Sequence, residues 1–169
     1  MKETWRATLL LFFVWLTWYA TSHVWVFVLD DANLIFHEAG HVLFAPFGEV
    51  LYTMGGSLFQ ILLPASIAIA FLRQRDIFSA LLSFWWAGES MLGVGRYIAD
   101  ARAQNLELIG GEHDWALLLS RWPHLMQYDI VIGGIVRNMG ILVMCTALTL
   151  CAFVVFRNIK NIPTHEAGV

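Results

Sequence analysis

Four long apolar stretches, separated by short polar segments, constrain the fold of this chain more than any other feature of its sequence. A helix needs about 20 consecutive apolar residues to cross the hydrocarbon core of a bilayer. The stretches that approach this length are Trp5–Leu29, Gly56–Leu72, Ile77–Ile98 and Ile130–Phe156. Each is therefore predicted to be a transmembrane helix, and residues 1–169 are predicted to form a single all-α bundle in the membrane.

The composition excludes most classes of soluble protein. Of the 169 residues, 59% are hydrophobic and 14% are charged, whereas a soluble domain has about 25% charged residues. Such a chain has too few polar side chains to cover a particle of its size in water. A nucleic-acid partner is not expected either, because the formal net charge is −3 and no basic patch is present. The lipid bilayer is the expected surrounding.

Three shorter segments complete the predicted architecture. Asn33–Phe47 is apolar, but it can form only about 22 Å of helix, so we expect it to dip into the membrane without crossing it. Gly48–Gly56 has a glycine at each end and β-formers between them, a pattern typical of a loop or short hairpin. His113–Trp122 is predicted to be a short helix on the membrane surface, because its apolar side carries Trp and Leu.

The distribution of Lys and Arg favours a topology in which both termini are cytoplasmic. If segment 33–47 returns to its own side, one face of the membrane carries most of the basic residues, namely Lys2, Arg6, Arg73, Arg75, Arg157 and Lys160. By the positive-inside rule this face is cytoplasmic, and segments 30–56 and 100–128 meet on the opposite side. The expected location is a membrane of the bacterial inner-membrane type.

The dipping segment contains an H-E-x-x-H motif at His37, Glu38 and His41. Residues four apart project from the same side of a helix, so both imidazoles can reach one metal ion. Glu38 lies on a neighbouring side, from which it can take a proton from water and pass it to a leaving amine. Ionisable groups at membrane depth cost about 3 kcal/mol each unless they are partnered, which indicates function rather than packing. Zinc is the expected metal, since nitrogen and oxygen ligands around a hydrolytic motif suit it.

A catalytic zinc site needs a third protein ligand and an open position for water. The candidates for this ligand are His113, Asp114, Glu89 and His124. His113 and Asp114 follow two glycines at the start of the predicted short helix, on the same side of the membrane as the motif. His113 is favoured because imidazole suits zinc, and Asp114 could instead cap the helix or support a ligand. Glu89 lies inside the third span, and His124 follows a proline.

A polar stripe lies on one side of the third span, where Glu89, Gly93, Arg96 and Asp100 fall within about 40° of one another. The stripe either orients ligands and substrate or only joins the helices. Arg137 interrupts the fourth span, and an unpaired Arg at that depth is costly. We therefore expect Arg137 to pair with Glu89 or Asp100.

The motif and the sequence that follows it resemble the site-2 protease family of intramembrane zinc metallopeptidases. The similarity is specific over about residues 30–65, and includes the H-E-x-x-H motif, the glycine-bounded segment after it and the Gly-Gly-Ser sequence at 55–57. The resemblance implies that the two motif histidines bind zinc and that Glu38 is the catalytic base. The family's third ligand is an Asp in a distant helix, commonly followed by Gly. This sequence has no Asp-Gly pair, so the motif does not assign that role, although the precedent adds weight to Asp114.

Together these features predict a zinc-dependent endopeptidase that hydrolyses peptide bonds of membrane or membrane-adjacent proteins. Gln60 could donate a hydrogen bond to the oxyanion of the substrate, or could bond to a neighbouring helix. Val50–Met54 is expected to pair with an extended substrate segment by strand addition. The alternatives are a non-catalytic zinc-binding scaffold or sensor, a haem-carrying bundle, and a transporter, for which the sequence has no inverted repeat. The haem alternative is disfavoured because His37 and His41 share one helix side, which suits a single metal.

Overall fold

The computed structural model describes residues 2–23, 26, 28–108 and 112–160, and this part of the chain contains helices and no strands. The α-helices and one 3₁₀ helix are α1 (Lys2–Ser22), α2 (Leu29–Phe44), η1 (Ala45–Phe47), α3 (Glu49–Arg73), α4 (Ile77–Ala99), α5 (Asp114–Ser120), α6 (Pro123–Met126) and α7 (Asp129–Lys160). The all-α prediction is therefore confirmed. Residues 24, 25 and 27 of the first predicted span, and the two glycines at 110 and 111 before the predicted short helix, lie outside the described residues.

Three helices, α3, α4 and α7, are long and apolar enough to cross a membrane. They extend over the second, third and fourth predicted spans, and α7 exposes large apolar side chains such as Leu142 and Phe153. The first predicted span is represented by α1, which ends at Ser22 and is not among the three, because Arg6 and its Trp, Tyr and Thr residues lower its hydropathy. This architecture is compatible with a membrane protein, and the predicted count of four crossings stays a prediction.

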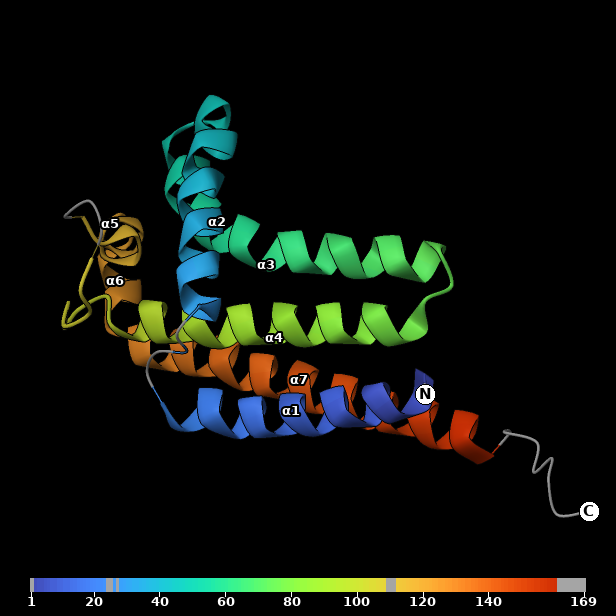
Figure 1. Ribbon diagram of the computed structural model, residues 1–169. Helices are drawn as coiled ribbons and strands as arrows, with labels where there is room; N and C mark the ends of the chain where they lie inside the picture. Colours follow the sequence, from blue (N-terminus) through green and yellow to red (C-terminus); the bar gives the residue numbers. More distant parts are fainter. Residues whose placement is uncertain (1, 24–25, 27, 109–111, 161–169) are drawn as a thin grey trace, which may run out of the picture.

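The ends of the long helices are sorted between the two ends of the bundle (Figure 1). The start of α1, the α3–α4 turn and the end of α7 lie together, and each carries basic residues. Helices α5 and α6 and the described part of the segment after α4 lie at the opposite end. This grouping is the one that the Lys and Arg pattern predicts, and the side on which the cytoplasm lies stays a prediction.

Glycines let α4 and α7 pack with their backbones in contact. A Cβ atom added at Gly95 would lie 2.6 Å from the carbonyl oxygen of Gly133, and one added at Gly88 would lie 2.8 Å from that of Gly140. Both pairs therefore mark positions where only glycine fits, as is common between membrane helices. The apolar core beside them is formed by Ala20, Val26, Trp85, Leu92, Met144, Ala147 and Leu148.

Two half-buried arginines, one on α4 and one on α7, bond to the C-terminal end of α1. Arg96 donates to the carbonyl of Ala20, and Arg137 Nη2 donates to the carbonyl of Thr21 at 3.4 Å. The expected pairing of Arg137 with Glu89 or Asp100 is therefore wrong. The last carbonyls of a helix have no partner within the helix, and Arg side chains satisfy them favourably there.

Helix α2 crosses the bundle at a steep angle, and the first turns of α3 return along it (Figure 1). The loop or hairpin predicted for 48–56 is wrong, because α3 is continuous from Glu49 and only Gly48 departs from helical geometry. A Cβ atom on Gly55 would lie 2.7 Å from the carbonyl oxygen of Gly40. This close contact between α2 and α3 favours a helix where the local propensity favours a strand. Strand addition at Val50–Met54 is consequently withdrawn.

Replacing Asp76 by Ala is expected to lower the free energy of unfolding by about 1 kcal/mol. Asp76 precedes α4 and accepts hydrogen bonds from the Ser79 hydroxyl at 2.6 Å and the Ser79 amide at 3.1 Å. These bonds hold the pKa of Asp76 below its ordinary 3.8, so the stabilisation is present above that pH and is lost as pH falls through the lower folded pKa. Thermal denaturation in detergent tests this, with Asp76→Ser as the capping control. An Asp76→Ala variant as stable as the parent would contradict the role.

Candidate metal centre

The two histidines of the motif lie one turn apart on α2 and face the same space. Their ring centroids are 4.9 Å apart, and both residues are buried. Gly40 between them allows α2 to approach α3 closely, and Gly56 of α3 lies directly against the His37 ring. The sequence therefore combines two ligand-type side chains with the small residues needed to place them in a tight helix contact.

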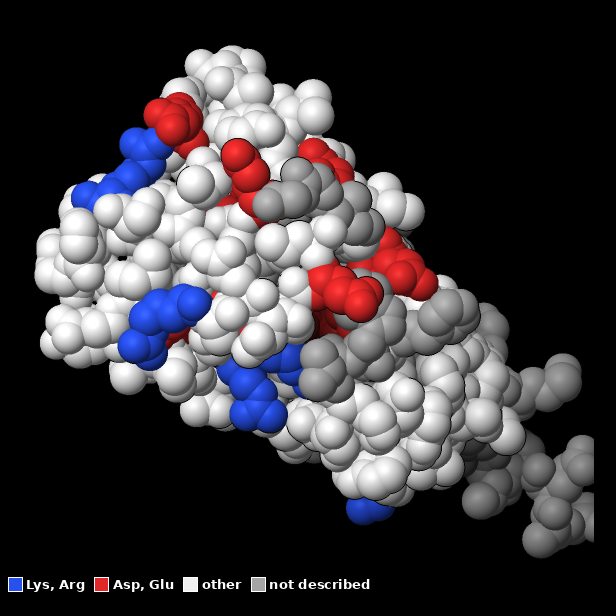
Figure 2. All heavy atoms as spheres, turned by 90° about the vertical axis from the view of Figure 1, so that its left-hand side faces the viewer, with Lys and Arg blue, Asp and Glu red and all other residues white. Residues whose placement is uncertain are grey.

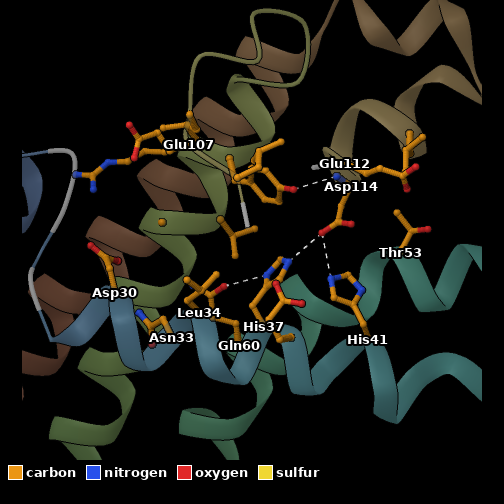
Figure 3. Close-up of a pocket in the computed structure, with 18 of the residues that line it drawn as sticks. Asp30, Asn33, Leu34, His37, His41, Thr53, Gln60, Glu107, Glu112 and Asp114 are labelled. Atoms are coloured by element: carbon orange, nitrogen blue, oxygen red, sulfur yellow. Dashed lines mark hydrogen bonds and ion pairs between the residues drawn. The ribbon is translucent and has the colours of Figure 1, made fainter. Parts of the chain in front are cut away.

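Asp114, the first residue of α5, brings its carboxylate to both histidines (Figure 3). Its Oδ2 atom lies 2.9 Å from His37 Nε2 and 3.2 Å from His41 Nε2. Two elements far apart in the sequence, α2 and α5, thus direct two imidazoles and one carboxylate at a common point. Of the four candidates for a third ligand, Asp114 is the one whose carboxylate lies beside both histidines.

The other ring nitrogen of each histidine faces an oxygen that can only accept a hydrogen bond. His37 Nδ1 lies 3.4 Å from Gln60 Oε1, and His41 Nδ1 lies 2.8 Å from the carbonyl oxygen of Tyr52. Each Nδ1 can therefore donate to its oxygen, which leaves Nε2 of both rings directed at the Asp114 carboxylate. Two imidazole nitrogens and a carboxylate oxygen that converge in this way form a donor set for a metal cation. Histidine metal ligands have the same arrangement, with the second nitrogen held by an oxygen.

Glu38 completes the group. Ligand-type atoms of His37, Glu38 and His41 all lie within 4.8 Å of one another, and Glu38 is exposed where the histidines are buried. Its carboxylate is therefore close to the convergence point and still open to the cleft. This position suits a group that exchanges protons with water.

The centre lies in a cleft of about 840 Å³, within the range of 300–1,000 Å³ typical of small-molecule and cofactor sites. Its walls come from α2, α3, α4, α5 and the segment that follows α4 (Figure 3). The cleft thus has room for an extended piece of polypeptide beside the metal-type cluster.

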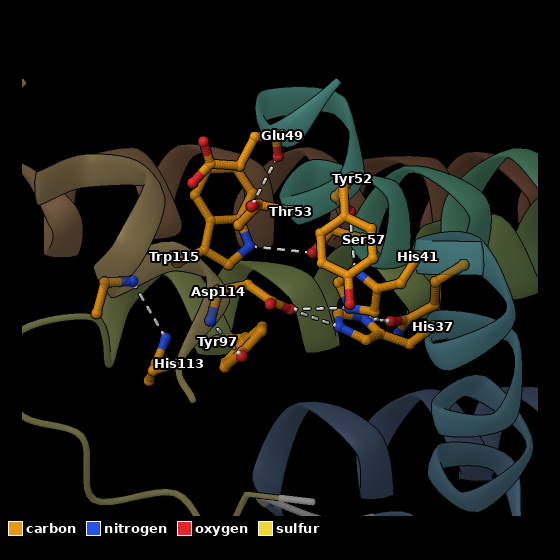
Figure 4. A network of polar contacts seen from close by, with 12 residues as sticks. His37, His41, Glu49, Tyr52, Thr53, Ser57, Tyr97, His113, Asp114 and Trp115 are labelled. Atoms are coloured by element: carbon orange, nitrogen blue, oxygen red, sulfur yellow. Dashed lines mark hydrogen bonds and ion pairs between the residues drawn. The ribbon is translucent and has the colours of Figure 1, made fainter. Parts of the chain in front are cut away.

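His113, the candidate favoured by the sequence, is not brought to this cluster. It is 3% exposed, its Nδ1 accepts a hydrogen bond from the Ala116 amide at 3.3 Å, and its ring stacks on Tyr97 at 4.2 Å (Figure 4). Its Nε2 lies 3.6 Å from Asp100 Oδ2. Burial lowers the pKa of His113, which keeps the ring neutral and Nδ1 able to cap α5. The preference for His113 over Asp114 is corrected accordingly.

The remaining candidates also lie elsewhere. Glu89 is 0% exposed, and its Oε2 accepts a hydrogen bond from the Asn33 side chain at 2.8 Å, which joins α4 to α2. His124 is exposed on α6. Gln60, expected to donate to a substrate oxyanion, instead accepts from His37, so its observed contact is with a ligand-type side chain.

Three contacts that the sequence does not reveal hold α5 over the cluster, and the first two can be followed in Figure 4. The Asp114 amide donates to the Tyr97 hydroxyl at 2.9 Å, and Trp115 Nε1 donates to the Ser57 hydroxyl at 3.0 Å. Arg121, at the end of α5, pairs with Glu49 of α3. Tyr52 acts through its backbone carbonyl, for which a sequence carries no signal at all.

Replacing Gly56 by Ala is expected to lower zinc affinity by about 10- to 100-fold, the range typical for disturbed supporting contacts of a metal ligand. The added Cβ atom would lie 2.5 Å from His37 Nε2, so the ring must shift from its position beside His41 and Asp114. Competition with a chelating indicator measures the change. Gly134→Ala is the matched control, because a Cβ atom there meets nothing within 4 Å. Unchanged zinc binding in Gly56→Ala would show that zinc affinity does not depend on the position of the His37 ring.

Comparisons with protein-family models, with curated proteins and with solved structures found no match to this chain.

Proposed function

We propose that this protein is a zinc-dependent membrane endopeptidase that hydrolyses peptide bonds of membrane or membrane-adjacent proteins. The observation that carries the proposal is the convergence of His37 Nε2, His41 Nε2 and Asp114 Oδ2, with the Glu38 carboxylate beside them. Two histidines and one carboxylate are the protein ligands typical of a hydrolytic zinc site that keeps a fourth position open for water. Glu38 is then available as the base. The resemblance of residues 30–65 to the site-2 protease family supports the same conclusion.

His37, His41 and Asp114 would hold the metal. Zinc, when bound, supplies a Lewis acid that polarises the scissile carbonyl and makes water more acidic. Gln60 and the Tyr52 carbonyl fix the tautomer and orientation of the two rings through their Nδ1 atoms. Gln60 is therefore assigned to positioning His37.

Glu38 would do the proton transfer. Its carboxylate takes a proton from the attacking water and then gives that proton to the leaving amine nitrogen, so one residue acts as base and acid in turn. Its exposure to the cleft allows contact with water and substrate, whereas the two histidines beside it are buried. The motif places this base one residue from a ligand, which fixes its distance from the reaction.

Removal of the metal tests the proposal. The purified protein is expected to contain about one zinc per chain, to lose activity toward single-span reporter proteins in proteoliposomes when treated with 1,10-phenanthroline, and to regain it with added Zn²⁺. Elemental analysis and gel-based cleavage assays measure the two properties. Activity that persists in zinc-free protein would overturn the proposal, as would a coloured preparation that contains haem.

A further inference from the structure

The candidate metal centre lies near the C-terminal end of α4 and beside the first half of α3. Of the residues of α4, only Gly93, Val94, Arg96 and Tyr97 are among the described residues that line the cleft, and α4 ends at Ala99. At a rise of 1.5 Å per residue, these four residues lie within about 10 Å of the C-terminal end of α4. The hydrocarbon core of a bilayer is about 30 Å thick. The centre is therefore close to one surface of the membrane.

The same end of the bundle carries short helices and a polar loop segment. Helices α5 and α6 lie there (Figure 1), and Arg102 forms an ion pair of 2.7 Å with Asp129 at the start of α7. Asp100 accepts hydrogen bonds of 3.0 Å from the amides of Asn105 and Leu106, which shape the segment after α4. Ion pairs and non-helical segments of this kind lie in the headgroup and water region of a membrane. A substrate would therefore reach the cleft from that region.

The walls of the cleft carry mainly negative charge. Its acidic residues are Asp30, Asp31, Glu38, Glu107, Glu112 and Asp114. Arg96 is the one Lys or Arg among the described residues of the lining, and it also bonds to the carbonyl of Ala20. Figure 2 looks onto this end of the molecule and shows Asp and Glu gathered on one part of it and Lys and Arg on another.

A zinc ion would offset the negative charges of Asp114 and Glu38, but not those of the other acidic residues that line the cleft. Asp31, Glu107 and Glu112 are exposed. Carboxylates that line a cleft with low-dielectric walls raise the local concentration of cationic ligands and repel anionic ones. An acidic segment beside a scissile bond would be disfavoured in this cleft, and a basic one favoured.

From this depth and charge we infer that the substrates are polypeptide segments that adjoin a membrane helix on this face and carry Lys or Arg next to the scissile bond. The inference rests on the proposed function. The segment would enter the cleft from the headgroup region, so the apolar part of its helix would not have to unwind. The cleavage position would then fall just outside the apolar stretch.

Binding to a form that does not cleave tests the ligand class separately from catalysis. Zinc-loaded Glu38→Gln protein in nanodiscs is titrated with two fluorescent single-span peptides that share one apolar stretch and carry either Lys-rich or Glu-rich flanks. The Lys-flanked peptide is expected to bind about 10-fold more tightly, with a preference that falls at high salt. Glu107→Gln combined with Glu112→Gln should reduce the preference to about 3-fold or less. Asp76→Asn, which removes a carboxylate at the opposite end of α4, should leave it unchanged.

Cleavage by the parent protein tests the position of the bond. Mass spectrometry is expected to place the cut in the basic flank. Equal binding of the two peptides would overturn the inference, and so would a cut inside the apolar stretch. Lys-selective binding without any cleavage would support the ligand class and count against the proposed peptidase activity.

Discussion

Replacing Glu38 by Gln is expected to abolish peptide-bond cleavage while the protein keeps its zinc. The amide has the shape of the carboxylate but cannot accept a proton from water or return one to the leaving amine. General acid–base catalysis contributes about 10²- to 10⁴-fold to a rate, so we expect kcat to fall by about 10³-fold. Single-turnover cleavage in proteoliposomes measures the rate, and elemental analysis measures the zinc.

The zinc content makes this result specific. Glu38 is exposed and the three converging ligand-type atoms belong to other residues, so its substitution should change neither folding nor metal binding. Asp76→Asn, a charge change outside the cleft, should keep both zinc and activity. If Glu38→Gln cleaves as fast as the parent, the proposed mechanism is wrong. If neither protein cleaves and both hold zinc, the alternative of a non-catalytic scaffold or sensor is favoured.

The long apolar helices α3, α4 and α7 could be predicted from the sequence because a bilayer imposes a simple rule on length and hydropathy. The predicted third span, Ile77–Ile98, differs from α4 by one residue. Segment 48–56 could not be predicted, because its helix depends on the contact of Gly55 with Gly40, and the flanking glycines and β-formers indicate a turn when read alone. Tertiary packing decides the structure at such places.

One part of the candidate site could likewise be predicted from the sequence, and another part could not. His37, Glu38 and His41 could be placed together because their spacing within one helix fixes their geometry. The choice between His113 and Asp114 could not be made, since the two are adjacent and a shift of one residue reverses which side chain faces the cleft. In the structure His113 caps α5 and the Asp114 amide bonds to Tyr97, so the Asp114 carboxylate is the side chain that faces the two histidines.

Replacing Asp114 by Ala is expected to remove zinc from the protein. The loss of a ligand should cost more than the 10- to 100-fold in affinity typical of a supporting contact, so we expect a decrease of more than about 100-fold. The bond from the residue 114 amide to Tyr97 belongs to the backbone and can remain, and Trp115 and Arg121 still hold α5 on α3. Competition with a chelating indicator measures the affinity, and circular dichroism checks the helix content.

Two matched variants decide whether the carboxylate of Asp114 itself is responsible. His113→Asn should keep zinc affinity within about 3-fold, because Asn caps a helix as well as any residue and the imidazole of His113 lies against Tyr97 and not at the cluster. Glu89→Gln should also keep zinc, because its side chain can still accept from Asn33. Loss of zinc in His113→Asn together with its retention in Asp114→Ala would reverse the assignment. In that case the Nε2 atoms of His37 and His41, whose Nδ1 atoms face Gln60 and the Tyr52 carbonyl, would bind zinc together with His113 and without the Asp114 carboxylate.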